Sequence, residues 1–158
     1  MYRLVPFIFE IKNKQDLFQN IERLPYQHME ENLLRQEMPA IDKLEAYVRR
    51  WMSMLEGCSV NFTRNWLHYA SVPPAGEDAQ NSSNKIYYDI AALRRILEAG
   101  TSSGEFSPDL NVDAAATGIA SPLYGTTLRY CSVNASFSLE EWADDVATLV
   151  RNIVLPHA

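Results

Sequence analysis

The sequence predicts an all-α fold, a bundle of about six helices in one domain. Apolar residues recur every three or four positions through most of the 158 residues, which is the spacing of a helix with one buried face. No segment alternates between apolar and polar residues for long enough to predict a strand. Proline, glycine and clustered serine and asparagine separate the periodic segments. A chain of this length is expected to form one domain with a substantial core.

The clearest helix is expected from Ser138 to Leu155. Ser138 is a suitable N-cap, and Glu141 three residues later completes a capping box. Phe137 and Trp142 occupy the two positions of a hydrophobic staple around that cap. The buried face is predicted to consist of Leu139, Trp142, Val146, Leu149, Val150 and Ile153.

The helix expected from Asn111 to Tyr130 has two apolar sides. One stripe is bulky and one is small, and Asp113 is the only charge between Val112 and Leu128. A helix that is apolar nearly all round has more than one packing partner. One side should therefore meet the protein's own core, and the other the last helix and a second copy of the chain. A central helix in a monomeric bundle is the alternative. The small stripe is Ala114, Ala115, Gly118, Pro122 and Gly125.

Four helices are expected ahead of this pair. The segment from Ser71 to Ser83 is predicted to be a loop, because it contains two prolines, a glycine and several polar residues. The predicted helices run from Asn13 through Leu34 with an interruption at Pro25, from Pro39 to Gly57, around Phe62 to Tyr69, and from Ile86 towards Gly104.

Composition and charge exclude some classes of function and location. The net charge of −6 argues against attraction of the whole surface to nucleic acid or to an anionic membrane. The sequence contains no transmembrane run and no signal peptide. Cys58 and Cys131 form neither a metal motif nor a disulfide framework, so we expect free thiols in a reducing compartment, the cytoplasm.

An enzyme is the least supported class. The three histidines are scattered, neither cysteine has a histidine in helical register, and no glycine-rich phosphate loop is present. The carboxylates near His28 lack the i, i+3 or i, i+4 repeat of a helical two-metal site. We therefore expect no catalytic residues, no metal site and no cofactor.

Two segments resemble the TetR (tetracycline-repressor) family of bacterial transcriptional regulators. Residues 7–18, FIFEIKNKQDLF, are similar to the family's segment that leads out of the recognition helix. Residues 99–115, AGTSSGEFSPDLNVDAA, resemble the family's G-x-x-x-G-E-F join between helices of the effector domain. The first motif is fairly specific, whereas the second is common in the family but loose. The resemblance, with the helix count and the terminal pair, covers most of residues 7–155.

The resemblance implies a homodimeric sensor of a small hydrophobic effector. In it, the last two helices of each subunit form a four-helix dimer interface, and ligand binding moves the helix that carries the DNA-binding head. Residues 13–158 would be the ligand-binding and dimerisation domain, and residues 1–12 the end of that head or an irregular segment. The expected dimer residues are Ala115, Gly118, Pro122, Gly125, Trp142, Val146, Leu149 and Ile153.

The effector would lie among the middle helices, which are rich in aromatic and sulfur side chains. Such residues line hydrophobic pockets, and Tyr and Trp also carry a polar group that can orient a ligand. Plain core filling is the alternative for each of them. The expected ligand-binding residues are Trp51, Met54, Phe62, Trp66, Tyr69, Tyr88, Leu123 and Tyr124.

The sequence also departs from the family pattern. A complete member has a helix-turn-helix that reads DNA, and none can be built from residues 1–12. Lys14 matches the family's phosphate-contacting lysine and Lys12 is nearby, but Glu10 would repel the DNA backbone. We expect DNA binding only if a complete helix-turn-helix is supplied. The chain is therefore either a fragment or a natural sensor without a DNA reader. The competing hypothesis is a DNA-free helical protein that binds a protein partner.

Overall fold

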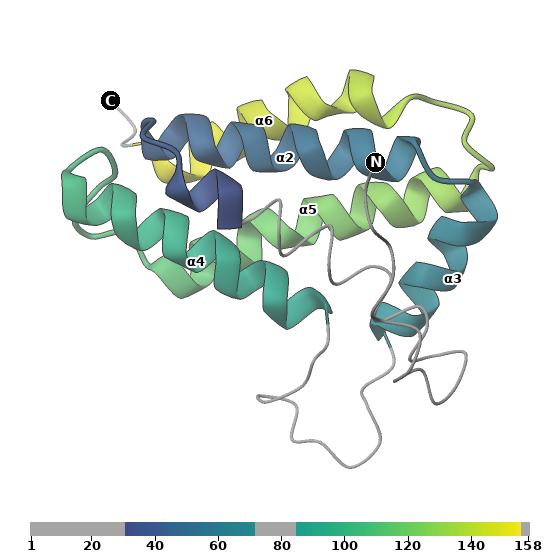
Figure 1. The fold of residues 1–158 in the computed structure, drawn as a ribbon, viewed down its shortest axis with the longest axis horizontal. Coiled ribbons are helices and arrows are strands. Elements are labelled where there is room, and N and C mark those ends of the chain that lie inside the picture. The colour runs from purple at the N-terminus through teal and green to yellow at the C-terminus, as the bar shows by residue number, and fades with distance from the viewer. Residues whose placement is uncertain (1–30, 72–84, 156–158) are drawn as a thin grey trace, which may run out of the picture.

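The structure is a computed structural model that describes residues 31–71 and 85–155, without the side chains of Tyr69 and Lys85. Residues 31–35 are helical, and no strand occurs in the described part of the chain. The expectation of an all-α bundle is confirmed there (Figure 1). The remaining helices are α2 (Ala40–Glu56), α3 (Val60–Ser71), α4 (Lys85–Ser103), α5 (Val112–Ser132) and α6 (Leu139–Val154).

Several predictions concern residues outside the described ranges. They are the irregular segment 1–12, the start of the first helix at Asn13, and the interruption at Pro25. The proposed DNA contacts Lys12 and Lys14 lie outside as well, as does nearly all of the loop predicted after Ser71. The other helices begin and end within a few residues of the positions predicted from their stripes, caps and glycines.

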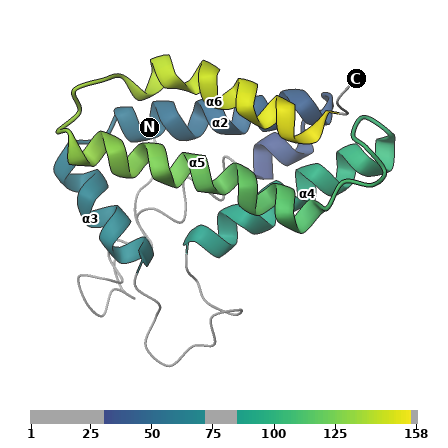
Figure 2. The same ribbon diagram turned by 180° about the vertical axis from the view of Figure 1, so that it is seen from behind.

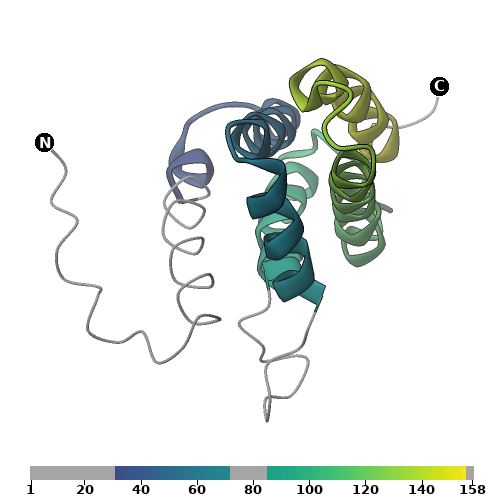
Figure 3. The same ribbon diagram turned by 90° about the vertical axis from the view of Figure 1, so that its right-hand side faces the viewer.

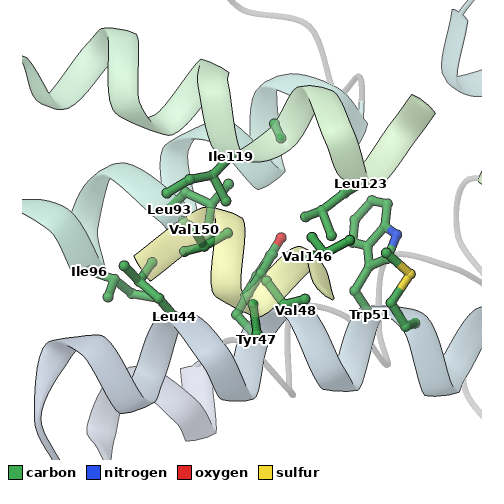
Figure 4. Packing of buried hydrophobic residues seen from close by; sticks show 14 of the residues in the cluster. Leu44, Tyr47, Val48, Trp51, Leu93, Ile96, Ile119, Leu123, Val146 and Val150 are labelled. Atoms are coloured by element: carbon green, nitrogen blue, oxygen red, sulfur yellow. The ribbon is translucent and has the colours of Figure 1, made fainter. Parts of the chain in front are cut away.

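Helices α4 and α6 run antiparallel to α5, and α2 runs in the same direction as α5 (Figure 1). Helix α2 lies along α6, and α4 lies along α5 (Figures 1 and 2). Helix α5 contacts all four of the other helices. Its bulky stripe points into the core, where it meets residues from α2, α4 and α6 (Figure 4). The expectation that one side of this helix meets the protein's own core is therefore confirmed. The core residues labelled in that view are Leu44, Tyr47, Val48, Trp51, Leu93, Ile96, Ile119, Leu123, Val146 and Val150.

Side-chain caps fix the starts of the last two helices. The Asn111 side chain accepts a hydrogen bond from the Ala114 amide at 3.0 Å. The Ser138 hydroxyl accepts one from the Glu141 amide at 3.3 Å, as its cap position predicted. The Phe137 and Trp142 rings lie 5.7 Å apart between centroids, in agreement with the predicted staple.

A carboxylate from another helix joins the cap of α6. Glu56, the last residue of α2, accepts hydrogen bonds from the Ser138 hydroxyl at 2.9 Å and from the Glu140 amide at 2.7 Å. A negative charge at a helix N-terminus is favourable, because it faces unpaired amides and the positive end of the helix dipole. The end of α2 is thereby fixed to the start of α6.

The GTSSGEF segment forms the corner after α4. Gly104 has φ +79°, the left-handed conformation that suits glycine just past a helix end. Gly100 lies against Phe106, and a Cβ added to it would come within 2.2 Å of that ring. Glu105 accepts a hydrogen bond from the Ala40 amide at 2.6 Å and so caps α2. Each of these residues has a structural role in joining α4 to its neighbours.

Candidate functional site

Three aromatic rings from three helices meet in the middle of the bundle. The centroid of the Trp51 ring lies 5.7 Å from that of Trp66 and 5.0 Å from that of Tyr124, in edge-on arrangements. The Trp66 and Tyr124 rings are nearly parallel, with centroids 5.7 Å apart. Such geometries are favourable because the positive edge of one ring meets the negative face of another. We call these three residues the aromatic cluster.

A buried carboxylate lies beside the aromatic cluster. Asp89 on α4 is 0% exposed. Its Oδ1 atom accepts a hydrogen bond from the Tyr47 hydroxyl at 2.8 Å, and its Oδ2 atom accepts one from the Tyr124 hydroxyl at 2.6 Å. Burial of a carboxylate is costly unless hydrogen bonds replace its hydration. The two tyrosines, from α2 and α5, therefore hold Asp89 at the junction of three helices.

Asp89 was not among the predicted site residues, although the sequence carries a signal for it. The stripe used to predict α4 contains Ile86, Ile90 and Leu93. Asp89 is three residues after Ile86 and four before Leu93, so it falls on the same face of the helix. An acidic residue at a core-facing position is uncommon and marks a polar partner inside the fold.

Trp66 brings a second polar group into this region. Its side chain is 1% exposed, and its indole N–H has no hydrogen-bond partner among the described residues. Leaving a buried donor without an acceptor costs roughly 1–3 kcal/mol. The aromatic cluster thus includes a buried indole donor that carries a free-energy cost.

The structure brings together only part of the predicted ligand-binding set. Trp51, Trp66 and Tyr124 meet in the aromatic cluster, whereas Leu123 is fully buried in the core. The other three described members are half-buried, and the side chain of the eighth, Tyr69, lies outside the description. The half-buried members are Met54, Phe62 and Tyr88.

The predicted dimer residues divide into buried and exposed groups. Ala115 and Val146 are buried within this chain, so their side chains are not available on its surface. Leu149 and Ile153 on α6 are 52% and 37% exposed. Pro122 and Trp142 are half-buried, and Gly118 and Gly125 are exposed.

One side of the α5–α6 layer carries the exposed members of that set. The other described helices lie on the opposite side of this layer in the end-on view (Figure 3). Leu128, which is not one of the predicted dimer residues, is 62% exposed on α5. We call the surface formed by Gly118, Gly125, Leu128, Leu149 and Ile153 the α5–α6 face.

The two glycines of the α5–α6 face are not required by contacts with described residues. A Cβ at Gly118 would come no closer than 4.0 Å to the Ile153 side chain, and a Cβ at Gly125 would have no described atom of another part of the chain within 4 Å. Glycine inside a helix costs about 0.5–1 kcal/mol relative to alanine. The packing of residues 31–71 and 85–155 gives no reason for this cost.

Arg129 lies at the end of α5 over two aromatic rings. Its guanidinium carbon is 4.7 Å from the centroid of Phe137 and 4.6 Å from that of Trp142. Cation–π contacts of this kind stabilise exposed sites by roughly 0.5–1 kcal/mol each. They hold Trp142, a predicted dimer residue, against the loop between α5 and α6.

Cys131 is a buried thiol at the end of α5. Burial raises the pKa of the Cys131 thiol, and the nearby Arg64 charge opposes this only in part. A raised pKa lowers the thiolate fraction at neutral pH and therefore the reactivity of the thiol.

Other described features fit a structural bundle. No group of three or more His, Cys, Asp or Glu residues in ranges 31–71 and 85–155 could hold a metal ion. None of the helices there combines the length and the apolar character needed to cross a bilayer.

Comparisons with protein-family models, with curated proteins and with solved structures give no match to this chain. The TetR resemblance therefore depends on the two sequence motifs. The GTSSGEF motif has a structural explanation in this chain, since it forms the corner that joins α4 to α2 and α5. The FIFEIKNKQDLF motif lies outside the described residues.

Proposed function

We propose that this chain is the effector-sensing and dimerisation portion of a TetR-like transcriptional regulator. The observation that carries the proposal is the α5–α6 face. Three large apolar side chains are exposed on it, at 62% for Leu128, 52% for Leu149 and 37% for Ile153. Clustered exposed apolar residues mark interaction surfaces.

A second copy of the chain is the occupant that this face fits best. On its two helices, the glycines would allow close approach of another helix backbone. A two-fold axis through such a surface would produce a four-helix interface in which each subunit contributes α5 and α6. The cost of glycine at positions 118 and 125 then has a reason, because side chains there would hold the two subunits apart.

In this proposal, the aromatic cluster and Asp89 form the sensing region. Their residues come from α2, α3, α4 and α5, and they do not include the residues of the α5–α6 face. DNA binding would require a helix-turn-helix joined ahead of residue 13, and the effector would act through the helix that the sequence predicts from Asn13 onward.

Sedimentation velocity of the purified chain from micromolar to high micromolar concentration tests the proposal. We expect a dimer, and we expect Leu149→Glu to weaken it roughly a hundredfold or more, because a buried charge would cost about 3 kcal/mol. Tyr87→Glu is the matched control, since Tyr87 is a similarly exposed apolar residue on α4. It should leave the dimer intact.

Three results would contradict the proposal. The wild-type chain could remain a monomer at high micromolar concentration. Both variants could weaken the dimer equally, which would place the interface elsewhere. A stable complex through the α5–α6 face with a different protein, in place of a homodimer, would favour the partner-binding hypothesis.

A further inference from the structure

We infer that two copies of the chain pair antiparallel through the α5–α6 face, so that α5 lies over α5 of the second copy and α6 over α6. In this arrangement, Leu128 of each copy fills the gap at Gly118 of the other. The inference rests on the proposed function, because it specifies how the proposed dimer is built.

The exposed side of α5 carries a regular repeat. Six exposed positions follow one another at alternating intervals of four and three residues. Such a seven-residue repeat keeps one line of side chains against a second helix that crosses at a shallow angle of about 20°. Five of the six residues are small, so the backbone of a second helix can approach closely. We call these six residues the α5 seam: Ala114, Gly118, Ser121, Gly125, Leu128 and Ser132.

One antiparallel register matches the large residue of the α5 seam with a small one. When two copies overlap along the whole seam, the midpoint lies between Ser121 and Gly125. Leu128 of one copy is then opposite Gly118 of the other, and Ser121 is opposite Gly125. The nearest described atom to a Cβ at Gly118 would be the end of the Ile153 side chain at 4.0 Å, which leaves room above the glycine for a leucine. A shift by one repeat in either direction leaves two of the six seam positions without a seam residue opposite them.

Helix α6 fits the same two-fold axis. At one end of the face, the Arg129 guanidinium lies over the Trp142 ring, 4.6 Å from its centroid. At the other end, the Cβ position of Gly118 is 4.0 Å from the Ile153 side chain. About midway between these two contacts, α5 has the midpoint of its seam and α6 has Leu149, which is 52% exposed. An axis at this level therefore also brings Leu149 against Leu149 of the second copy.

Charge favours the antiparallel pairing over a parallel one. The first half of α6 has four exposed carboxylates, and Arg49 forms an ion pair with one of them, Asp144. A two-fold axis along the helices would bring the acidic halves of both copies to the same end, where they would repel. The antiparallel axis separates them and places each near the second half of the other α6, whose last turn contains Arg151. The four carboxylates belong to Glu140, Glu141, Asp144 and Asp145.

A size exchange across the proposed contact tests the register. Sedimentation velocity gives the dimer dissociation constants of the wild type, Gly118→Leu, Leu128→Ala and the double variant. We expect Gly118→Leu to weaken the dimer roughly a hundredfold, because two leucines would compete for one gap, and Leu128→Ala to weaken it about tenfold. The double variant should return to within about tenfold of the wild type, because the new side chain fills the space that Leu128→Ala leaves.

Gly125→Leu combined with Leu128→Ala is the matched control, since Gly125 faces Ser121 in this register. This pair of changes should show no recovery. The three substituted positions are exposed in the single chain, so circular dichroism should show that every variant folds. A double variant at 118 and 128 that is no tighter than Gly118→Leu alone would overturn the register, as would equal recovery in the control.

Neutral substitutions in the acidic half of α6 test the direction of pairing. Glu141→Gln with Asp145→Asn keeps the shapes of the side chains and removes two exposed charges. In the antiparallel dimer, this change should leave the dissociation constant unchanged or raise it. A clearly tighter dimer would show that the acidic halves repel each other across the interface, and would overturn the antiparallel pairing.

The same measurements separate the inference from the proposed function. A dimeric wild type without recovery in the double variant would contradict the antiparallel register and leave the dimerisation proposal in place. A wild type that stays monomeric would contradict the proposed function, and this inference with it.

Discussion

The centre of the bundle buries a charged residue, whereas the α5–α6 face exposes large apolar residues. Both regions therefore depart from the usual distribution in folded proteins, in which apolar side chains are buried and charged ones are exposed. The centre holds a carboxylate, Asp89, with no exposed surface. The face exposes Leu128, Leu149 and Ile153. Both arrangements cost free energy in an isolated chain, one through desolvation of a polar group and the other through apolar surface left in water.

The chain offsets the cost in one of these regions and not in the other. At the centre, the chain itself offsets the cost, because Tyr47 and Tyr124 donate hydrogen bonds to Asp89. At the face, no described residue covers the exposed side chains or comes close enough to require the two glycines. The centre is therefore part of the folded chain, whereas the face is the surface that we propose a second copy covers. Substitutions in the two regions should therefore have different effects on folding and on association.

Trp66→Ala should destabilise the centre of the bundle and leave association through the α5–α6 face unchanged. Trp66 is buried and contacts two other rings, so its removal leaves a cavity and should lower the free energy of unfolding by about 3–5 kcal/mol. Urea denaturation measures this loss. The variant should still dimerise at concentrations where it remains folded, because Trp66 lies on α3. A loss below about 1 kcal/mol would show that Trp66 is not a core residue.

Tyr47→Phe should destabilise the centre through one hydrogen bond. Loss of a buried hydrogen bond to a carboxylate should lower the free energy of unfolding by about 1.5–3 kcal/mol. Tyr124→Phe is the matched comparison, and its effect should be smaller because water can partly replace that bond at a half-buried position. Denaturant titration of both variants checks the order, and the reverse order would contradict the burial of the Tyr47–Asp89 bond.

Gly125→Ala should stabilise the folded chain but weaken its association through the α5–α6 face. Alanine is the better helix former, and the position has room for a Cβ, so the subunit should gain about 0.5–1 kcal/mol. The dimer should become weaker, since the added methyl group would hold the subunits apart. Thermal melts at low concentration report the gain, and sedimentation reports the loss. If association strengthens instead, Gly125 does not lie at a close helix contact.

The smallest effect is expected from alkaline pH. It should lower the free energy of unfolding through two groups at the junction of α5 with the loop to α6. Burial, and to a lesser extent the Glu56 charge, raises the pKa of Tyr130, and burial raises that of Cys131. The unfolded chain therefore loses these protons first as the pH rises. Their contribution to stability is complete below the unfolded pKa values, near 9.0 for the thiol and 10.0 for the phenol, and is lost as the pH rises towards the folded values.

Unfolding measured by urea at a series of pH values checks this prediction. The free energy of unfolding should begin to fall above about pH 9. Tyr130→Phe should reduce the slope above pH 10. An unchanged slope in that variant would show that the fall comes from other groups.

The sequence alone determined the helices, because the signals for them are local. The caps Asn111 and Ser138 lie within three residues of the amides that they accept from, and the staple pair Phe137 and Trp142 lies within one turn and a half. The 3.6-residue period also separated the bulky, buried stripe of α5 from its small one. These features need no knowledge of how the helices pack.

Tertiary structure decided what depends on residues far apart in the chain. Glu56 caps a helix that begins 83 residues later at Leu139, and Asp89 finds its donors 42 residues before and 35 residues after it. Periodicity could place Asp89 on a buried face but could not name its partners. Periodicity also could not show that Val146 is buried and Leu149 is exposed, because both lie on the same apolar stripe of α6. That stripe is wider than the part of α6 that packs against the core. Burial is a property of the packed helices, and only their arrangement assigns each side of a stripe to the core or to water.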